Sequence, residues 1–257
     1  MAFALHAGTT MSERERLDVL LYERGLAPSR ARAQSLIRDG RVTANGVIVT
    51  RPGLLVEAST ELAISEGTAP DFASRGGKKL DPALDSFGVS LDGAVVVDVG
   101  ASTGGFTDAA LRRGARKVYA VDVGHDQLAP ALRADARVVV RERTNARELT
   151  AADFDDPVDV IVVDASFISL TKLSDAFARI LRPGGTLVAL VKPQFEVGPE
   201  LARKHRGVIR DPGDRRRAIE SVRSDLTSKG FEVLNGTDST VPGPKGNVEH
   251  FLHALRR

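Results

Sequence analysis

The sequence predicts an α/β protein in which a small α+β unit precedes a larger, doubly wound, mostly parallel sheet. Three observations support this prediction. Residues 75–257 alternate between strand-like and helix-like segments, as in parallel sheets. The first strand of that region ends in a glycine-rich turn, whereas residues 12–66 combine two short helices with a tight hairpin. A chain of 257 residues has room for two such domains.

The composition is that of a globular protein without cysteine chemistry. Hydrophobic residues make up 42% and charged residues 27% of the chain, which suffices for a packed core. The lack of cysteine excludes disulfides and thiolate metal sites and suits a reducing cytoplasm. The five histidines show no metal-ligand spacing, so we expect no metal cofactor. No apolar run approaches the roughly 20 residues of a membrane helix, and residues 1–10 make a poor signal peptide.

Residues 12–66 form the first predicted domain. Leucines at helical spacing predict a helix that stops at Gly25, and Ser29 is the candidate N-cap of a second helix. A hairpin follows with Asn45-Gly46 at its tip, the signal of a type I′ turn, and a further short strand covers 62–64.

Basic residues are concentrated in two stretches. Residues 14–51 hold eight arginines against four acids, and residues 203–217 hold seven basic residues against two acids, in a chain of net charge +2. Such stretches suit nucleic-acid phosphates. Ordinary solvated surfaces remain the alternative for both.

The order of two helices with arginine-rich flanks and a hairpin resembles the S4 RNA-binding domain. Residues 29–42 and Asn45-Gly46 carry the core pattern of that family. The resemblance implies RNA contacts by arginines of this domain, and the basic residues of the second domain extend the set. The candidates are Arg14, Arg16, Arg30, Arg32, Arg41, Arg51, Arg75, Arg203, Lys204 and Arg206.

A linker at 67–74, marked by glycine and proline, leads into the second domain at 75–257. Two strands at its end, 231–234 and 248–255, follow one another without a helix, which predicts an antiparallel hairpin and separates this sheet from a dehydrogenase-type one. Before them we expect strands at 94–99, 117–122, 138–141, 158–164 and 186–191, and helices at 106–113, 127–134, 173–181 and 213–229.

The first strand of the second domain ends in a turn with the spacing Gly-x-x-x-Gly-Gly, which differs from the pattern of dinucleotide binders. Asp122 ends the next strand, where an acid is suitably placed for ribose hydroxyls. Together they resemble motif I of S-adenosylmethionine (SAM) methyltransferases, with a structural turn or a nucleotide site as alternatives. The candidate cofactor residues are Asp98, Gly100, Ala101, Ser102, Thr103, Gly104, Gly105, Phe106, Asp122, Asn145 and Asp164.

Opposite charges end two further strands. Asp164 follows one apolar run and Lys192 follows the next. Charges often occur where a strand meets solvent, but two of them beside the cofactor loop favour a functional site. Asn145, in the loop after 138–141, borders the place of an adenine, although a surface turn explains it nearly as well.

Six motifs in combination resemble the TlyA family, also called haemolysin A-type, relatives of the FtsJ/RrmJ ribose methyltransferases. The resemblance spans 12–257 and implies a Rossmann-like class I methyltransferase domain behind an S4-like domain. It also implies SAM as cofactor, cytidines of ribosomal RNA as substrate and a cytoplasmic location. The motifs are Ser-Arg-Gly-x-x-Lys, Gly-Ala-Ser-Thr-Gly-Gly-Phe, Glu-Arg-Thr-Asn-Ala-Arg, Asp-x-Ser-Phe-Ile-Ser, Val-Lys-Pro-Gln-Phe-Glu and Gly-Asn-Val-Glu.

That family carries a Lys–Asp–Lys–Glu tetrad, which falls here on Lys79, Asp164, Lys192 and Glu249. Lys78 is a departure, since relatives often have histidine there. A ribose 2′-hydroxyl is a weak acid, so methyl transfer requires that the hydroxyl be held in line and its proton be accepted. We place Lys192 at the hydroxyl and Lys79 as the group that tunes it, and we expect the two acids to orient the lysines.

Two other functions stay open. A haemolysin or membrane-perturbing protein would need an amphipathic or apolar segment, and the sequence shows none. A non-catalytic RNA-binding module that keeps the methyltransferase fold would not need the tetrad, so an intact tetrad argues against it.

Overall fold

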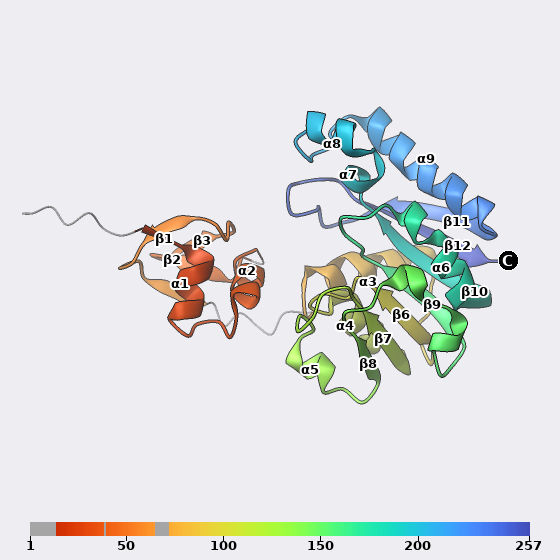
Figure 1. Cartoon of the computed structure of the whole chain (residues 1–257), viewed down its shortest axis with the longest axis horizontal. Coiled ribbons are helices and arrows are strands. Elements are labelled where there is room, and N and C mark those ends of the chain that lie inside the picture. Colours follow the sequence, from red (N-terminus) through yellow and green to blue (C-terminus); the bar gives the residue numbers. More distant parts are fainter. Residues whose placement is uncertain (1–13, 39, 65–71) are drawn as a thin grey trace, which may run out of the picture. The chain divides into compact units, whose positions relative to one another are not determined.

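The computed structural model describes residues 14–38, 40–64 and 72–257. These residues belong to two compact units, 1–69 and 70–257 (Figure 1). Most of the predicted linker, 67–71, lies outside the described residues. Its last residues are part of the second unit, because the Ala73 amide donates to Asp108 Oδ2 at 2.6 Å and the Ser74 hydroxyl accepts from the Gly76 amide.

Unit 1 packs two helices against short antiparallel strands around an apolar core. The predicted hairpin is confirmed, with Asn45 and Gly46 at φ of +49° and +78° and Val42 paired with Val49. The sheets have the orders β3-β2-β5 and β1-β4. The elements are β1 (Arg14–Arg16), α1 (Leu17–Glu23), α2 (Arg30–Arg38), β2 (Val42–Ala44), β3 (Val47–Val49), β4 (Leu55–Glu57) and β5 (Leu62–Ile64).

Unit 2 is built on a seven-stranded sheet of order β11-β12-β10-β9-β6-β7-β8. The pairs from β10 to β8 are parallel, while β12 runs antiparallel to both β10 and β11, so the predicted C-terminal hairpin is confirmed. The strands are β6 (Val95–Val99), β7 (Lys117–Val121), β8 (Val138–Arg141), β9 (Val158–Val163), β10 (Leu181–Val191), β11 (Phe231–Asp238) and β12 (His250–Arg256).

Helices cover both faces of this sheet (Figure 1). Side chains of α3 and α4 share one apolar cluster with the sheet, and those of α6 and α9 share the other. The α-helices are α3 (Arg75–Phe87), α4 (Gly105–Arg112), α5 (Pro130–Arg133), α6 (Ser174–Ile180), α7 (Pro193–Glu196), α8 (Pro199–Lys204) and α9 (Pro212–Ser228). Three short 3₁₀ helices are η1 (Ala146–Glu148), η2 (Ala151–Asp153) and η3 (Leu170–Lys172).

Three predicted elements differ from their expected limits by three or more residues. Strand β10 begins at Leu181, five residues early, because Leu181 already pairs with Val158 before a register shift leads to Thr186. Strand β11 continues to Asp238 along β12. Helix α5 is confined to Pro130–Arg133, within the wider helix predicted at 127–134.

Helices α3 and α4 cross closely because glycine lies at the contact. A Cβ on Gly105 would lie 2.2 Å from Ser74 Oγ and 2.9 Å from the Gly77 amide nitrogen, distances at which no side chain fits. The glycine-rich turn is therefore needed for the packing of α4 on α3, in addition to any role in binding a ligand. The close crossing of the two helices places α3, which carries Lys79, against the loop between β6 and α4.

Candidate active site

The loop after β6 is tied to the ends of two other strands. Gly100 has φ of +86°, and a Cβ there would lie 3.0 Å from the carbonyl carbon and oxygen of Asp164. The Ser102 amide donates to Asp122 Oδ2 at 2.8 Å, and the Gly124 amide donates to Asp122 Oδ1 at 2.7 Å. Asp122 thus holds the loop in place. Asp122 itself remains partly accessible to solvent at the end of β7.

Asp98 is a fully buried carboxyl group at the end of β6. Thr107 Oγ1 donates to its Oδ2 at 2.7 Å, whereas its Oδ1 has no hydrogen-bond partner among the described residues. Burial raises the pKa of Asp98 to about 7, the nearby charges of Asp164 and Asp122 add to this rise, and the bonds from Thr107 oppose it. The group is therefore poised between its neutral and ionised forms near neutral pH.

The other candidate cofactor residues differ in their burial and in their contacts. The Phe106 ring is buried and stacks on Phe251, so its side chain belongs to the core. Gly104 leaves room for the side chain of Leu132, since a Cβ would lie 2.3 Å from Leu132 Cδ1. Ala101 is buried, while Ser102 and Thr103 are at least partly exposed in the loop.

Asn145 caps η1 with its own side chain. Its Oδ1 accepts from the Arg147 amide at 3.2 Å, and its Nδ2 donates to Glu148 Oε1 at 2.8 Å. Both ends of the amide therefore have partners within the same turn. An adenine contact by this residue stays a prediction.

Lys192 is held at the end of β10 by three oxygen atoms. Its Nζ lies 2.6 Å from Asp164 Oδ1, as an ion pair rather than a well-aligned hydrogen bond. It donates to Ser166 Oγ at 2.7 Å and to the carbonyl oxygen of Asp164 at 3.2 Å. The side chain is only 9% exposed. Its nitrogen is thus fixed beside the loop that follows β9.

Lys79 and Glu249 form a second pair, which is buried. Lys79 Nζ donates to Glu249 Oε2 at 2.7 Å, and the two residues are 7% and 1% exposed. Glu249 Oε1 has no hydrogen-bond partner within the described part of the chain. A Cβ on Gly243 would lie 2.6 Å from that oxygen, so the loop before β12 closes tightly over the carboxylate.

The sheet register brings both pairs to one edge. Val163 pairs with Ala189, so Asp164 and Lys192 follow neighbouring parallel strands at their carboxyl ends. Val191 pairs with His250, so Lys192 and Glu249 extend adjacent antiparallel strands towards the same point. Glu249 in turn holds Lys79 of α3. The four predicted catalytic residues therefore gather as two lysine–carboxylate pairs, at the edge where ligands bind in open α/β sheets.

Two residues of this edge were not singled out from the sequence. Ser166 accepts a hydrogen bond from Lys192. Phe167 is 92% exposed and has φ of +64°, a backbone conformation that bulky residues rarely adopt, and its ring lies 5.3 Å from that of Phe195. An aromatic residue three positions beyond a strand-end acid is the signal that could have identified it.

Comparison with known proteins identifies the fold. A model described as "FtsJ-like methyltransferase" matches residues 72–256, and a model described as "S4 domain" matches residues 15–62. The chain belongs to the FtsJ-like methyltransferase family. It carries an S4 domain at its N-terminal end.

Curated relatives match most of this FtsJ-like protein. It is 43% identical to the "16S/23S rRNA (cytidine-2′-O)-methyltransferase TlyA" of Mycobacterium tuberculosis, over 94% of this chain and 90% of that protein. It is 32% identical to the "23S rRNA (cytidine-2′-O)-methyltransferase TlyA" of Campylobacter jejuni, over 72% and 71%. It is 40% identical to "Hemolysin A" of Brachyspira hyodysenteriae, over 93% and 99%.

Solved structures agree with this assignment. A protein from Streptococcus thermophilus that carries a hemolysin name superposes with a TM-score of 0.73 at 39% identity, over 96% of this chain and 90% of that one. A SAM-dependent methyltransferase from Mesorhizobium loti, at 18% identity and a TM-score of 0.50 over 68% and 96%, shares the fold alone.

No helix within 14–38, 40–64 and 72–257 is long and apolar enough to cross a membrane. Over the same residues, no three His, Asp or Glu side chains come together as a metal-binding group.

The S4 domain organises part of its arginine set around one buried carboxylate. Asp18 accepts from Arg16 Nε at 2.9 Å and from Gln34 Nε2 at 2.7 Å, and Arg30 lies 3.5 Å away. These partners lower the pKa of Asp18 to about 2, against the cost of burial. Arg16 and Arg30 stay about half exposed, so the carboxylate orients them at the surface.

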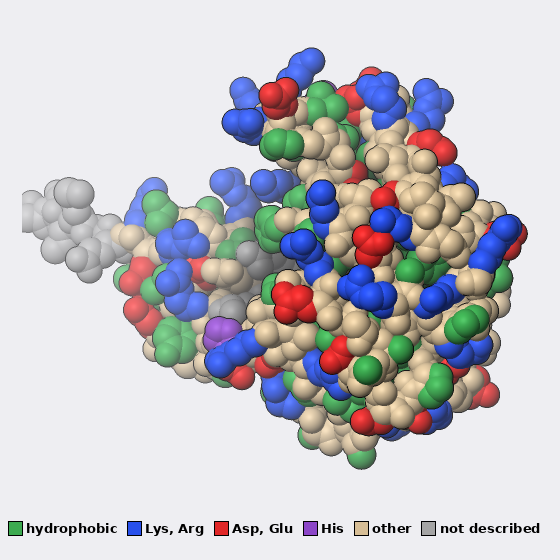
Figure 2. Space-filling view, turned by 45° about the vertical axis from the view of Figure 1, so that its right-hand side comes forward, with side chains coloured by type: hydrophobic (Ala, Val, Ile, Leu, Met, Phe, Trp, Pro, Cys, Tyr) green, Lys and Arg blue, Asp and Glu red, His purple; other side chains and the backbone are tan. Residues whose placement is uncertain are grey.

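The remaining basic candidates lie at or near the surface. Arg14 and Arg51 are exposed in the S4 domain, whereas Arg32 and Arg41 are partly buried. In unit 2, Arg75 begins α3. Figure 2 shows Lys and Arg side chains gathered over α8 and the first turns of α9, at the top of the view. The exposed candidates of that region are Arg203, Lys204 and Arg206.

The Asp18 cluster predicts an acid-sensitive S4 domain. Because the folded pKa lies below the usual 3.8, the cluster stabilises the domain above about pH 4, and the gain is lost as the pH falls towards 2. We expect a loss of about 1–2 kcal/mol over that range. Urea titrations of the full chain, followed by NMR signals of α1 and α2 from pH 2 to 6, measure it. Asp18→Asn should flatten the profile, and an unchanged slope in this variant would contradict the cluster's role.

Proposed function

We propose that this protein transfers the methyl group of SAM to the 2′-hydroxyl of a cytidine in ribosomal RNA. The observation that supports it most is the pair of lysine–carboxylate contacts at the carboxyl edge of the sheet. The names of the Mycobacterium and Campylobacter relatives supply the substrate class. Ribosomal subunits are the expected partner and the cytoplasm the expected location.

The residues present fit SAM. Gly100 lets the loop pack directly against the backbone at Asp164, Asp122 lies at the end of β7 for ribose hydroxyls, and Asp98 Oδ1 is buried without a partner among the described residues. The loop 100–105, together with Asp98, Asp122 and Asn145, would hold the cofactor. When bound, SAM supplies an electrophilic methyl group on a positively charged sulfur.

The lysine–carboxylate pairs supply the chemistry at the hydroxyl. The hydroxyl proton would pass to Lys192 Nζ in its amine form, while SAM, when bound, would supply the methyl group and keep the electron pair of the broken carbon–sulfur bond. Ser166 and Asp164 hold Lys192 Nζ in position. The buried Lys79–Glu249 pair lines the neighbouring strand end and supports that geometry. The exposed ring of Phe167 lies three residues after Asp164, where it can stack on a base of single-stranded RNA.

The raised pKa of Asp98 predicts that the stability of the SAM-free protein depends on pH. Its folded pKa of about 7 lies above the usual 3.8, so the folded state loses stability as the pH rises from about 4 to 7. Asp98→Asn should flatten that loss and weaken SAM binding at least about tenfold. Urea unfolding across this range and calorimetry with SAM measure the two effects.

Asp126 offers the matched control for Asp98. It is exposed in the loop after β7 and has φ of +53°, a conformation that asparagine tolerates, so Asp126→Asn should change neither property. Equal SAM affinity of Asp98→Asn and the wild type would count against a cofactor site at the end of β6.

A labelling experiment tests the proposed function as a whole. The full chain is incubated with methyl-labelled SAM and with purified small or large ribosomal subunits, and the label is followed into RNA and protein. We expect label in RNA. Label in protein alone, or none in either fraction, would exclude an RNA methyltransferase.

A further inference from the structure

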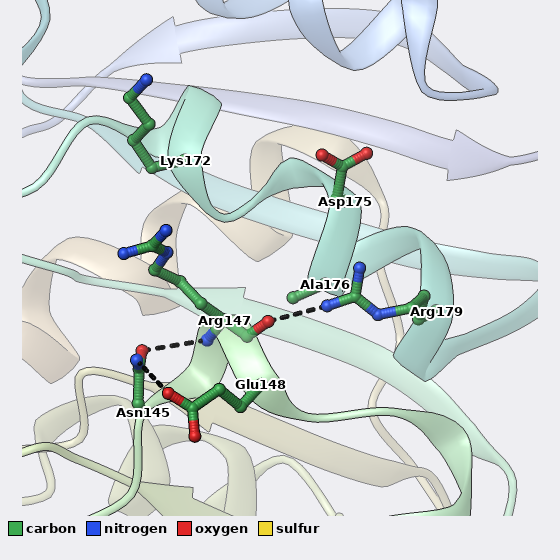
Figure 3. A pocket seen from close by; sticks show the side chains of 7 residues that line it. All are labelled: Asn145, Arg147, Glu148, Lys172, Asp175, Ala176 and Arg179. Atoms are coloured by element: carbon green, nitrogen blue, oxygen red, sulfur yellow. Dashed lines mark hydrogen bonds between the residues drawn. The ribbon is translucent and has the colours of Figure 1, made fainter.

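A group of basic side chains outside the tetrad lines a pocket between η1, η3 and α6 (Figure 3). Helix η1 follows the carboxyl end of β8, and η3 follows the loop after β9, so the pocket lies towards the edge of the sheet that carries the site. Its volume is about 300 Å³. It is lined by Asn145, Arg147, Glu148, Lys172, Asp175, Ala176 and Arg179.

Both carboxylates of this pocket already have partners. Glu148 Oε1 accepts from Asn145 Nδ2 at 2.8 Å, which holds it against η1. Asp175 Oδ1 pairs with Lys229 Nζ at 2.8 Å, a cation that does not line the pocket. Neither acid therefore pairs with the lysine or the arginines that line the pocket.

The three basic side chains that line the pocket have fewer partners between them than its carboxylates. Arg179 donates one bond, from its guanidinium to the carbonyl oxygen of Arg147 at 2.7 Å, which joins α6 to η1. The side chains of Arg147 and Lys172 are exposed and make no ion pair or hydrogen bond with any residue that the structure describes. Three cations thus face one uncompensated acid, Glu148. The pocket has an excess of positive charge and free N–H donors.

We propose that this pocket binds a backbone phosphate of the substrate RNA, close to the nucleotide that is methylated. The inference rests on the proposed function and adds a contact to it. The Arg147 guanidinium on η1 and the Lys172 ammonium group on η3, both among the pocket's lining residues, match the charge and the acceptor oxygens of a phosphodiester. Because Arg147 and Asn145 share one turn, a bound phosphate also steadies the loop that borders the cofactor.

The test compares two double variants of the full chain. Arg147→Ala/Lys172→Ala removes the two free cations. Arg116→Ala/Arg182→Ala removes two arginines that pair with Asp156 and Asp159 at the amino ends of the strands, on the other edge of the sheet. The dissociation constant for purified ribosomal subunits is measured at several salt concentrations, and SAM binding is measured by calorimetry.

The pocket variant should bind ribosomal subunits about tenfold more weakly at physiological salt. Its slope of log K against log salt should be about one unit less steep, as expected for one lost phosphate contact. SAM affinity should stay unchanged, and the control variant should match the wild type in both measurements.

Three results would overturn the proposal. Equal slopes for the two variants would exclude a phosphate contact in the pocket. A loss of SAM affinity in the pocket variant would assign the pocket to the cofactor site instead. If the wild type methylates RNA and the pocket variant binds and methylates it equally well, this inference alone is contradicted. If the wild type methylates no RNA, the proposed function itself is contradicted.

Discussion

Lys192→Ala is expected to lower the rate of methyl transfer at least about a thousandfold. The reason is geometric, because Lys192 Nζ is the amine fixed between Asp164 and Ser166 at the end of β10. The partners of this side chain are Asp164 and Ser166 rather than residues of the loop 100–105, so SAM affinity should change less than about threefold. Single-turnover transfer of label to ribosomal subunits measures the first quantity, and calorimetry measures the second.

Two further variants sharpen this result. Lys192→Arg keeps the positive charge but cannot give up its proton, so it should stay as inactive as Lys192→Ala if proton transfer matters. Lys117→Ala removes a lysine paired with Asp156 at the amino end of β7 and should retain full activity. Transfer that survives in Lys192→Ala would remove Lys192 from the mechanism.

Breaking the Lys79–Glu249 pair should destabilise the protein strongly. Glu249→Leu leaves the Lys79 ammonium buried without its partner, which costs about 3–5 kcal/mol of unfolding free energy. The double variant Lys79→Met/Glu249→Leu replaces both charges with apolar groups and should recover most of that loss. Urea unfolding of the single and double variants measures the coupling between the two residues.

The same double variant separates stability from function. We expect it to fold and bind SAM but to transfer methyl groups at least about a hundredfold more slowly, because the pair lines the reacting edge. Full activity in a stable double variant would show that the buried pair is structural only. Loss of stability in the double variant equal to that in Glu249→Leu would contradict the ion-pair argument.

Much of the sheet was predictable because its strands are continuous apolar runs. Strands β6, β7 and β9 lie within a residue of the predicted limits, since apolar runs bounded by glycine or charge are hard to mistake. Helix α3 was not assigned, because Gly76, Gly77 and Pro82 weaken any helical signal, and only the capped, tightly packed structure explains it. Strands β1 and β4 have three residues each, too few for a period.

The candidate site was predictable where it follows strand ends. Asp98, Asp122, Asp164 and Lys192 all end or follow apolar runs, which mark the carboxyl edge of a parallel sheet. The contact between Lys79 and Glu249 joins residues 170 positions apart, and no local pattern encodes it. The Asn145 amide caps η1 with both of its polar atoms. This arrangement depends on side-chain geometry, which cannot be predicted from the sequence pattern.

The most direct test of the proposed function is the chemical identity of the methylated nucleoside. Ribosomal RNA treated with SAM and the full chain is digested to nucleosides and analysed by mass spectrometry, with RNA treated with Lys192→Ala as the reference. We expect new 2′-O-methylcytidine in the wild-type sample and none in the reference. A methyl group found on a base, or 2′-O-methylcytidine formed equally by both proteins, would contradict it.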